Sequence, residues 1–184
     1  MSHRDKVEMD EKAYGYLKSC EKILDVGCGR GRFIELCPEK MTGIDMNKES
    51  VGFCLKMGYR ALKGKATAIP FDADYFDGIH CSHIVEHLFP HEAWTMFKEI
   101  DRVLKVGGVV VFRTPYMHDK FYGDMEHVKP YLPSAIKNYF VDNKLRALQL
   151  QFPRLNGHYE QIGFENRADN TAYMLVLRKL EKLG

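Results

Sequence analysis

The sequence has no long apolar run, no strong excess of charge and no closely paired cysteines. A membrane-spanning helix needs about 20 consecutive apolar residues, and no run approaches that length. A net charge of +2 is too small to indicate a nucleic-acid surface. The five cysteines include no CxxC pair, which is typical of reduced thiols. These absences predict an intracellular globular protein that neither spans a membrane nor binds nucleic acid.

The polar start of the chain, MSHRDKVEMDEK, lacks the apolar segment of a secretory signal, so we expect a cytoplasmic location. A length of 184 residues fits one domain over residues 1–184. Nothing in the pattern indicates an oligomer.

The stretch ILDVGCGRG at residues 23–31 places an acid and three glycines where a buried strand gives way to a turn. Ile23, Leu24 and Val26 are the apolar positions of a parallel strand. Glycines let a ligand lie against bare backbone amides. The carboxylate of Asp25 would repel a pyrophosphate but suits a positively charged ligand. The GxGxG spacing after an acid therefore favours a cationic, nucleotide-like cofactor.

A second strand is predicted at residues 41–44, and Asp45 follows it. A carboxylate there can accept hydrogen bonds from both hydroxyls of a ribose. Met46 is flexible and polarizable, which suits one face of an adenine and equally suits core filling. A dehydrogenase would use Asp45 in the same way, but the GxGxG spacing disfavours that alternative.

Strands and helices alternate along the first two thirds of the chain. Further strands are predicted at residues 59–63, 75–81 and 109–113, and helices at 8–19, 32–37, 48–57 and 91–105. This order indicates a parallel sheet with helices on both faces.

The last third of the chain changes character. A helix is predicted from residue 133 to about 141, then two apolar runs at 145–152 and 172–178 with no helix between them, as suits an antiparallel pair. We expect residues 179–184 to fray.

Together with the glycine turn, four segments resemble the class I S-adenosylmethionine (SAM)-dependent methyltransferases, particularly the branch that acts on small molecules. They are TGIDMN at 42–47, AIPFDADYFDGIHCSHIVEHL at 68–88, RVLKVGG at 102–108 and VVVFRTP at 109–115. The resemblance implies SAM as the cofactor. It also implies a Rossmann-like, doubly wound sheet of seven strands, mostly parallel, into which the last strand inserts antiparallel.

Ligands of doubly wound sheets bind beyond the carboxyl ends of the strands, where the strand order reverses. The cofactor site is therefore expected at four strand ends. Its predicted residues are Asp25, Gly27, Cys28, Gly29, Gly31, Asp45, Met46, Lys65, Ala66, Cys81 and Ser82. We expect Cys28 to act as a small residue in a tight space rather than as a reactive thiol.

Lys65 departs from the family pattern, which usually has an acid before the alanine that corresponds to Ala66. In the family that acid accepts a hydrogen bond from the adenine amino group. Lysine offers donors and no acceptor. Adenine recognition is thus expected to rest on shape or on backbone groups around Ala66.

Catalysis of methyl transfer depends mainly on alignment, because a sulfonium is already a good leaving group. A base is needed only where the acceptor must lose a proton. The candidates are His127, with Asp124 to orient its imidazole, and His83 at the end of the fourth strand. His127 is preferred, although a bracing role in the loop at 115–133 is an equal alternative for it.

The letters HIVEH at residues 83–87 also fit the HxxEH signature of some zinc hydrolases. Pro90 leaves room for barely one helical turn after them, and the methyltransferase pattern explains the same letters. A metal site of Asp124, His127 and His83 is a further option, but such ligands are too common in loops to favour it. We therefore predict no metal.

The function predicted is SAM-dependent methyl transfer to a small-molecule acceptor. The alternatives are a methyltransferase that acts on RNA or protein, because no added substrate domain closes the pocket, and a SAM-binding subunit without catalysis of its own. The sequence Cys81-Ser82-His83-Ile84 after the fourth strand contains no Asn/Asp-Pro-Pro-aromatic motif, which argues against methylation of adenine or glutamine amino groups.

Overall fold

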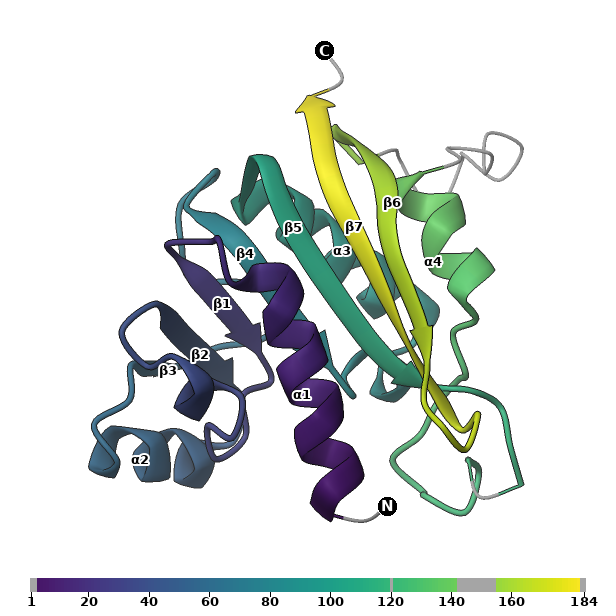
Figure 1. Ribbon diagram of the computed structural model, residues 1–184, viewed down its shortest axis with the longest axis horizontal. Helices are drawn as coiled ribbons and strands as arrows, with labels where there is room; N and C mark the ends of the chain where they lie inside the picture. Colours follow the sequence, from purple (N-terminus) through teal and green to yellow (C-terminus); the bar gives the residue numbers. More distant parts are fainter. Residues whose placement is uncertain (1–2, 120, 142–154, 183–184) are drawn as a thin grey trace.

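Seven strands form one sheet in the order β3-β2-β1-β4-β5-β7-β6 (Figure 1). The computed structural model describes residues 3–119, 121–141 and 155–182. The strands are β1 (Ile23–Val26), β2 (Met41–Asp45), β3 (Ala61–Lys63), β4 (Phe76–Ser82), β5 (Leu104–Pro115), β6 (Gly157–Asn166) and β7 (Ala172–Lys182). The helices are α1 (His3–Leu17), α2 (Lys48–Lys56), α3 (Pro90–Val103) and α4 (Pro133–Phe140), with single 3₁₀ turns η1 (Ile34–Leu36) and η2 (Val85–His87).

The first five strands are parallel, whereas β7 runs antiparallel between β5 and β6. This arrangement confirms the predicted Rossmann-like sheet with an antiparallel C-terminal strand. None of the helices within the described ranges has the length and apolar character that crossing a membrane requires.

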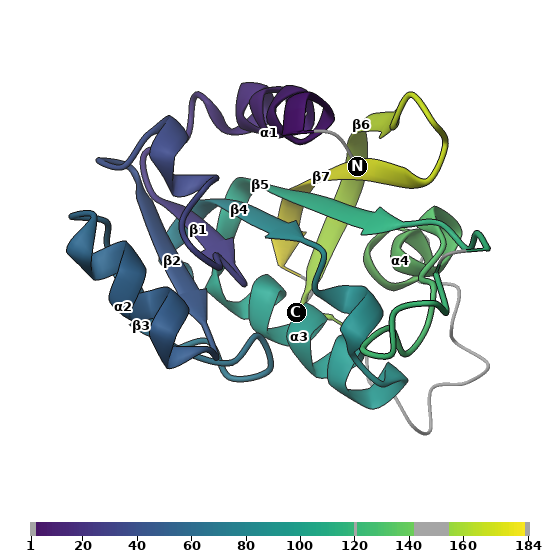
Figure 2. The ribbon, with the colours of Figure 1, turned by 90° about the horizontal axis from the view of Figure 1, so that it is seen from below.

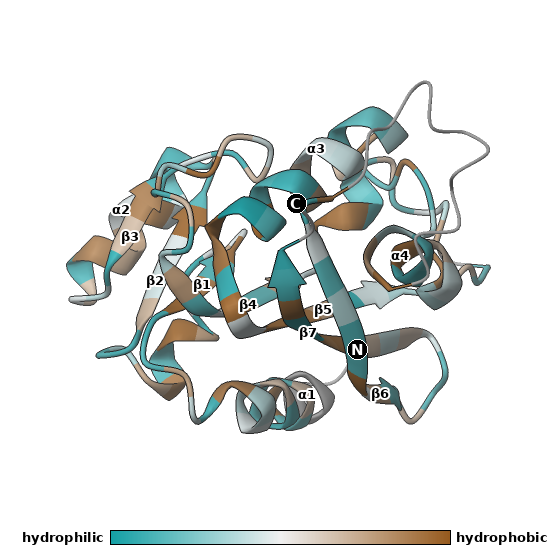
Figure 3. Ribbon diagram, turned by 90° about the horizontal axis from the view of Figure 1, so that it is seen from above, coloured by the Kyte–Doolittle hydropathy of each residue, from teal (hydrophilic) through white to brown (hydrophobic). Residues whose placement is uncertain are grey.

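Two layers of apolar side chains cover the sheet, because alternate residues of a strand point to opposite faces. Val110 and Phe112 of β5 belong to one apolar cluster with residues of α3 and α4, whereas Val109 and Val111 belong to a second cluster with residues of α1 and α2. Figure 2 shows α1 and α3 on opposite faces of the sheet. Apolar segments, brown in Figure 3, run along the central strands.

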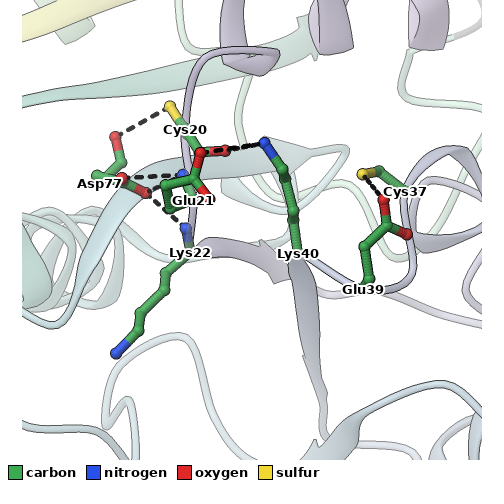
Figure 4. A network of polar contacts seen from close by, with 7 residues as sticks. All are labelled: Cys20, Glu21, Lys22, Cys37, Glu39, Lys40 and Asp77. Carbon is green, nitrogen blue, oxygen red and sulfur yellow. Dashed lines mark hydrogen bonds and ion pairs between the residues drawn. The ribbon is translucent and has the colours of Figure 1, made fainter.

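The amino end of β1 is fixed by the carboxylate of Asp77. It accepts hydrogen bonds from the backbone N–H of Lys22 at 2.8 Å and of Glu21 at 2.9 Å (Figure 4). Lys40 donates to the carbonyl of Cys20 at 3.1 Å on the same side. The hydrogen bonds of Asp77 hold the amino end of β1 against β4, at the end of the sheet opposite the carboxyl ends of the parallel strands.

Three local predictions were wrong. The helix predicted at 32–37 is only the turn η1, since Pro38 disfavours a helical conformation at Cys37, whose φ is −162°. The helix predicted at 91–105 ends at Val103, because Leu104 already pairs with Phe76 of β4. Residues 179–182 belong to β7 instead of fraying, while 183–184 lie outside the described residues.

The strand predicted at 145–152 also lies outside the described residues. The outer antiparallel partner of β7 is β6, a strand that no sequence pattern predicted. Only Gly157 and Tyr159 of β6 are buried, and the strand contains no continuous apolar run.

Candidate functional site

The glycine turn after β1 brings the chain close to the segment that follows β4. Gly27 has a φ of +70°, and a Cβ there would lie 2.0 Å from Cδ1 of Ile84. Both facts require glycine at this position. The side chain of Ile84 therefore packs directly against the backbone of the turn.

Asp45 ends β2 beside this turn. Its Oδ2 accepts a hydrogen bond from the backbone N–H of Gly29 at 2.8 Å, and its Oδ1 accepts one from the N–H of Asn47 at 2.8 Å. Asn47 in turn caps α2 by accepting from the N–H of Glu49 at 2.8 Å. The carboxylate is thus held in one orientation, and each oxygen keeps a lone pair for a further donor.

A cavity of about 270 Å³ opens at these strand ends. It is lined by Gly27, Ile44, Asp45, Met46, Gly64, Lys65, Ala66, Thr67, Ile84, His87, Leu88 and Glu92. Five predicted cofactor residues thus meet there: Gly27, Asp45, Met46, Lys65 and Ala66. Met46 is 62% exposed, which excludes core filling as its role.

The other predicted cofactor residues lie outside this lining. Cys28 is buried, and burial, with the nearby charge of Asp25, raises the pKa of its thiol. Burial likewise raises the pKa of the Cys81 thiol. Neutral, enclosed thiols of this kind fill space, as expected for Cys28. Gly29 and Gly31 shape the turn with φ values of +52° and +79°. Ser82 places its buried Oγ, which has no hydrogen-bond partner among the described residues, at the end of β4.

Asp25 is buried, and its Oδ1 lies 2.8 Å from Nδ1 of His80, its neighbour in the register of β1 and β4. The His80 ring stacks on Phe33 with centroids 3.6 Å apart. The sequence analysis missed His80, although a histidine within a buried strand is a signal of such a pair. Asp25 is therefore paired within the sheet and does not line the cavity.

His83 follows β4 in a left-handed conformation, with a φ of +56°. Non-glycine residues adopt this conformation rarely, and strain of this kind clusters at functional sites. Nδ1 of His83 lies 3.0 Å from Oε1 of Glu86, which is completely buried. Oε2 of Glu86 accepts from the hydroxyl of Thr114 at 3.1 Å. The pair leaves Nε2 of His83 free on a side chain that is 38% exposed.

His127 lies in the loop between β5 and α4. Its Nδ1 donates to the carbonyl of Phe121 at 2.8 Å, so a backbone group orients the ring. Oδ2 of Asp124 lies 3.8 Å from Nε2, beyond hydrogen-bond distance. The orienting bond expected from Asp124 is therefore supplied by Phe121 in this structure.

Residues 83–87, which fit the HxxEH signature, contain only the single turn η2 and not the longer helix of the zinc hydrolase motif. Within the described ranges, the side chains that meet at metal-ligand distances are Glu86, His87 and His127. The metal site considered from the sequence consisted of Asp124, His127 and His83, so it shares only His127 with this group. Ile84, His87, Leu88 and Glu92 of the cavity wall were also missed, because their placement depends on how the chain turns after β4.

Residues 24–112 match a family model described as a methyltransferase domain. A phthiotriol/phenolphthiotriol dimycocerosates methyltransferase of Mycobacterium leprae is 33% identical over 106 residues, which are 51% of this chain and 37% of that protein. A fatty-acid O-methyltransferase of Mycolicibacterium smegmatis is 29% identical over 101 residues, 50% of this chain and 36% of that protein.

The chain thus spans little more than a third of the length of these relatives. The crystal structure of a SAM-dependent methyltransferase from Archaeoglobus fulgidus superposes with a TM-score of 0.70 at 24% identity, covering 97% of this chain and 95% of that one. This likeness concerns the fold. The matched family model identifies residues 24–112 of this chain as a methyltransferase domain, and the superposition shows that its fold is that of a SAM-dependent methyltransferase.

Proposed function

We propose that this protein transfers a methyl group from SAM to a small-molecule acceptor. The observation that carries the proposal is the fixed carboxylate of Asp45, which stands between the glycine turn and the cavity. Its free lone pairs suit the two hydroxyls of a ribose. Met46 and Ala66 supply the apolar wall for a base, and Gly27 lines the same cavity.

SAM, when bound, supplies a methyl group on a sulfonium, so this chain's residues need to bind, align and exclude water. Of the predicted bases, His83 has the geometry that best supports proton transfer. The buried carboxylate of Glu86 holds its Nδ1 at 3.0 Å, which orients the ring and leaves Nε2 free. His127, whose ring is held by a neutral carbonyl, is the second candidate.

A small acceptor is supported by the modest net charge of +2 and by the similarity to an enzyme that methylates a fatty acid. The test is incubation with SAM labelled in its methyl group and with three separate pools: small molecules, RNA and protein. We expect label in the small-molecule pool. Label in RNA or protein would favour the alternative acceptors, and SAM binding without any transfer would favour a non-catalytic subunit.

Asp45→Ala is expected to weaken SAM binding by about 1.5–3 kcal/mol, or roughly 10-fold to 150-fold, through the loss of hydrogen bonds to a charged acceptor. Calorimetric titration with SAM and S-adenosylhomocysteine measures the effect. Asp72→Ala is the matched control, because Asp72 lies outside the lining of this cavity. Tight binding of NAD with no response to SAM would contradict the cofactor assignment.

Lys65→Asp is expected to tighten SAM binding. The lysine side chain offers only donors, and the substitution places a hydrogen-bond acceptor at this position of the cavity wall. One added hydrogen bond contributes about 1 kcal/mol, or roughly fivefold in affinity. Lys56→Asp on α2 makes the same charge change away from the cavity and should leave affinity unchanged. Unchanged or weaker binding in Lys65→Asp would mean that backbone groups already satisfy the adenine.

A further inference from the structure

Two separate parts of the chain bring Glu86, His87 and His127 together beside the cavity. One potential ligand atom of each residue lies within 4.8 Å of those of the other two. Glu86 and His87 belong to η2, after β4, whereas His127 lies in the loop after β5. The backbone N–H groups of Val128 and Lys129 donate to the carbonyl of Glu86 at 2.8 and 3.2 Å. Main-chain hydrogen bonds therefore fix the two segments against each other.

Both imidazoles are oriented by backbone carbonyls. Nδ1 of His87 lies 3.0 Å from the carbonyl of Glu126, and Nδ1 of His127 lies 2.8 Å from that of Phe121. A carbonyl only accepts, so each Nδ1 carries the proton and each Nε2 keeps a lone pair. Metal-binding histidines usually have this arrangement, in which a second hydrogen bond fixes the tautomer and the ring.

Glu86 brings a negative charge into the same place. Its side chain is completely buried, and its two side-chain partners are the imidazole of His83 and the hydroxyl of Thr114. Neither partner carries a permanent positive charge. A buried carboxylate is costly unless a cation compensates it. The carboxylate of Asp124, 3.8 Å from Nε2 of His127, adds further negative charge at the exposed side.

We propose that Glu86, His87 and His127 bind a divalent first-row transition-metal ion. Two imidazoles and one carboxylate suit ions such as Zn²⁺, Mn²⁺ or Fe²⁺, whereas Mg²⁺ and Ca²⁺ prefer oxygen ligands alone. Three protein ligands leave coordination positions for water or a substrate oxygen.

His87 also lines the cavity, so the ion would border the candidate cofactor site. The role of the ion in the reaction rests on the proposed function. At this position the ion would bind the hydroxyl of an acceptor and lower the pKa of that hydroxyl. His127 then acts as a ligand, and His83 remains the candidate base.

The test is titration of the chelator-treated, full-length protein with Co²⁺, followed by visible absorption, and with Zn²⁺, Mn²⁺ and Mg²⁺, followed by calorimetry. We expect a single equivalent of the transition metals to bind, with Mg²⁺ at least about tenfold weaker. His87→Ala and His127→Ala should each weaken binding at least about tenfold. Circular dichroism checks that each variant is folded.

His158→Ala is the matched control, since His158 lies on β6 with Glu181 at 3.7 Å and belongs to a lone imidazole–carboxylate pair. It should bind the ions as the unaltered protein does. The proposal is overturned if the unaltered protein binds no stoichiometric transition metal, if it binds Mg²⁺ equally well, or if both histidine variants retain full affinity. Because metal binding is measured directly, its failure is distinguishable from a failure to bind SAM or to transfer methyl groups.

Discussion

Replacing His83 with alanine is expected to lower the turnover of methyl transfer by about 10²–10⁴-fold, the usual contribution of a general base. SAM affinity should stay nearly unchanged, because His83 does not line the cavity that holds Asp45. The reason for expecting a base lies in the geometry. The buried Glu86 carboxylate holds Nδ1, the strained backbone fixes the residue, and Nε2 is free. Steady-state kinetics with the identified acceptor, beside SAM titrations, measure both effects.

His91→Ala is the control for this experiment, since His91 is an exposed residue at the start of α3. If alignment alone drives the reaction, His83→Ala should cost less than about tenfold. Measuring His127→Ala in parallel tests the preference that the sequence motif gave to that residue. A loss confined to His127→Ala would make His127 the essential group and remove His83 from proton transfer.

Lys179→Met should destabilise the fold by about 3–5 kcal/mol, the usual cost of removing one partner of a buried ion pair. The Lys179 ammonium is 1% exposed and lies 3.1 Å from Oδ1 of Asp101. It also donates to the carbonyl of Leu104 at 3.0 Å. The Asp101 carboxylate accepts further bonds from the N–H of Asn156 and the hydroxyl of Tyr159, both at 2.8 Å. This network joins α3 to β6 and β7.

Urea unfolding at neutral pH, monitored by circular dichroism, measures the loss. Lys182→Met removes a lysine from the same strand, where its partner Asp74 and its own side chain are both partly exposed. That control should cost no more than about 1 kcal/mol. Equal losses in the two variants would show that the buried network contributes no more than a surface pair.

The strands β1, β2 and β4 were predicted within a residue or so, because each is a short segment whose residues are mostly buried on both faces. The same signal fails at β6, where only Gly157 and Tyr159 are buried. It also fails at Lys179. A lysine in sequence is expected to be exposed to solvent, and its buried partner Asp101 is known only from the fold. Local pattern thus predicts central strands better than edge strands.

The candidate cofactor cavity was largely predictable, because Gly27, Asp45 and Ala66 each follow a strand and the sheet brings those ends together. Their cofactor roles remain predictions. The grouping of His127 with Glu86 and His87 was not predictable, since 39 positions separate His87 from the Glu126 carbonyl that orients it. Such a contact depends on the path of an irregular loop, which has no periodic signature.

The position of β7 in the sheet also governs the order in which a newly made chain can fold. β5 is complete at Pro115, yet its antiparallel neighbour begins at Ala172. Val110 and Phe112 of β5 are covered in the finished protein, but one edge of that strand has no hydrogen-bonding partner until β7 leaves the ribosome. An unpaired apolar edge invites association with other chains. During synthesis the edge of β5 is therefore open to pairing with other chains until β7 is made.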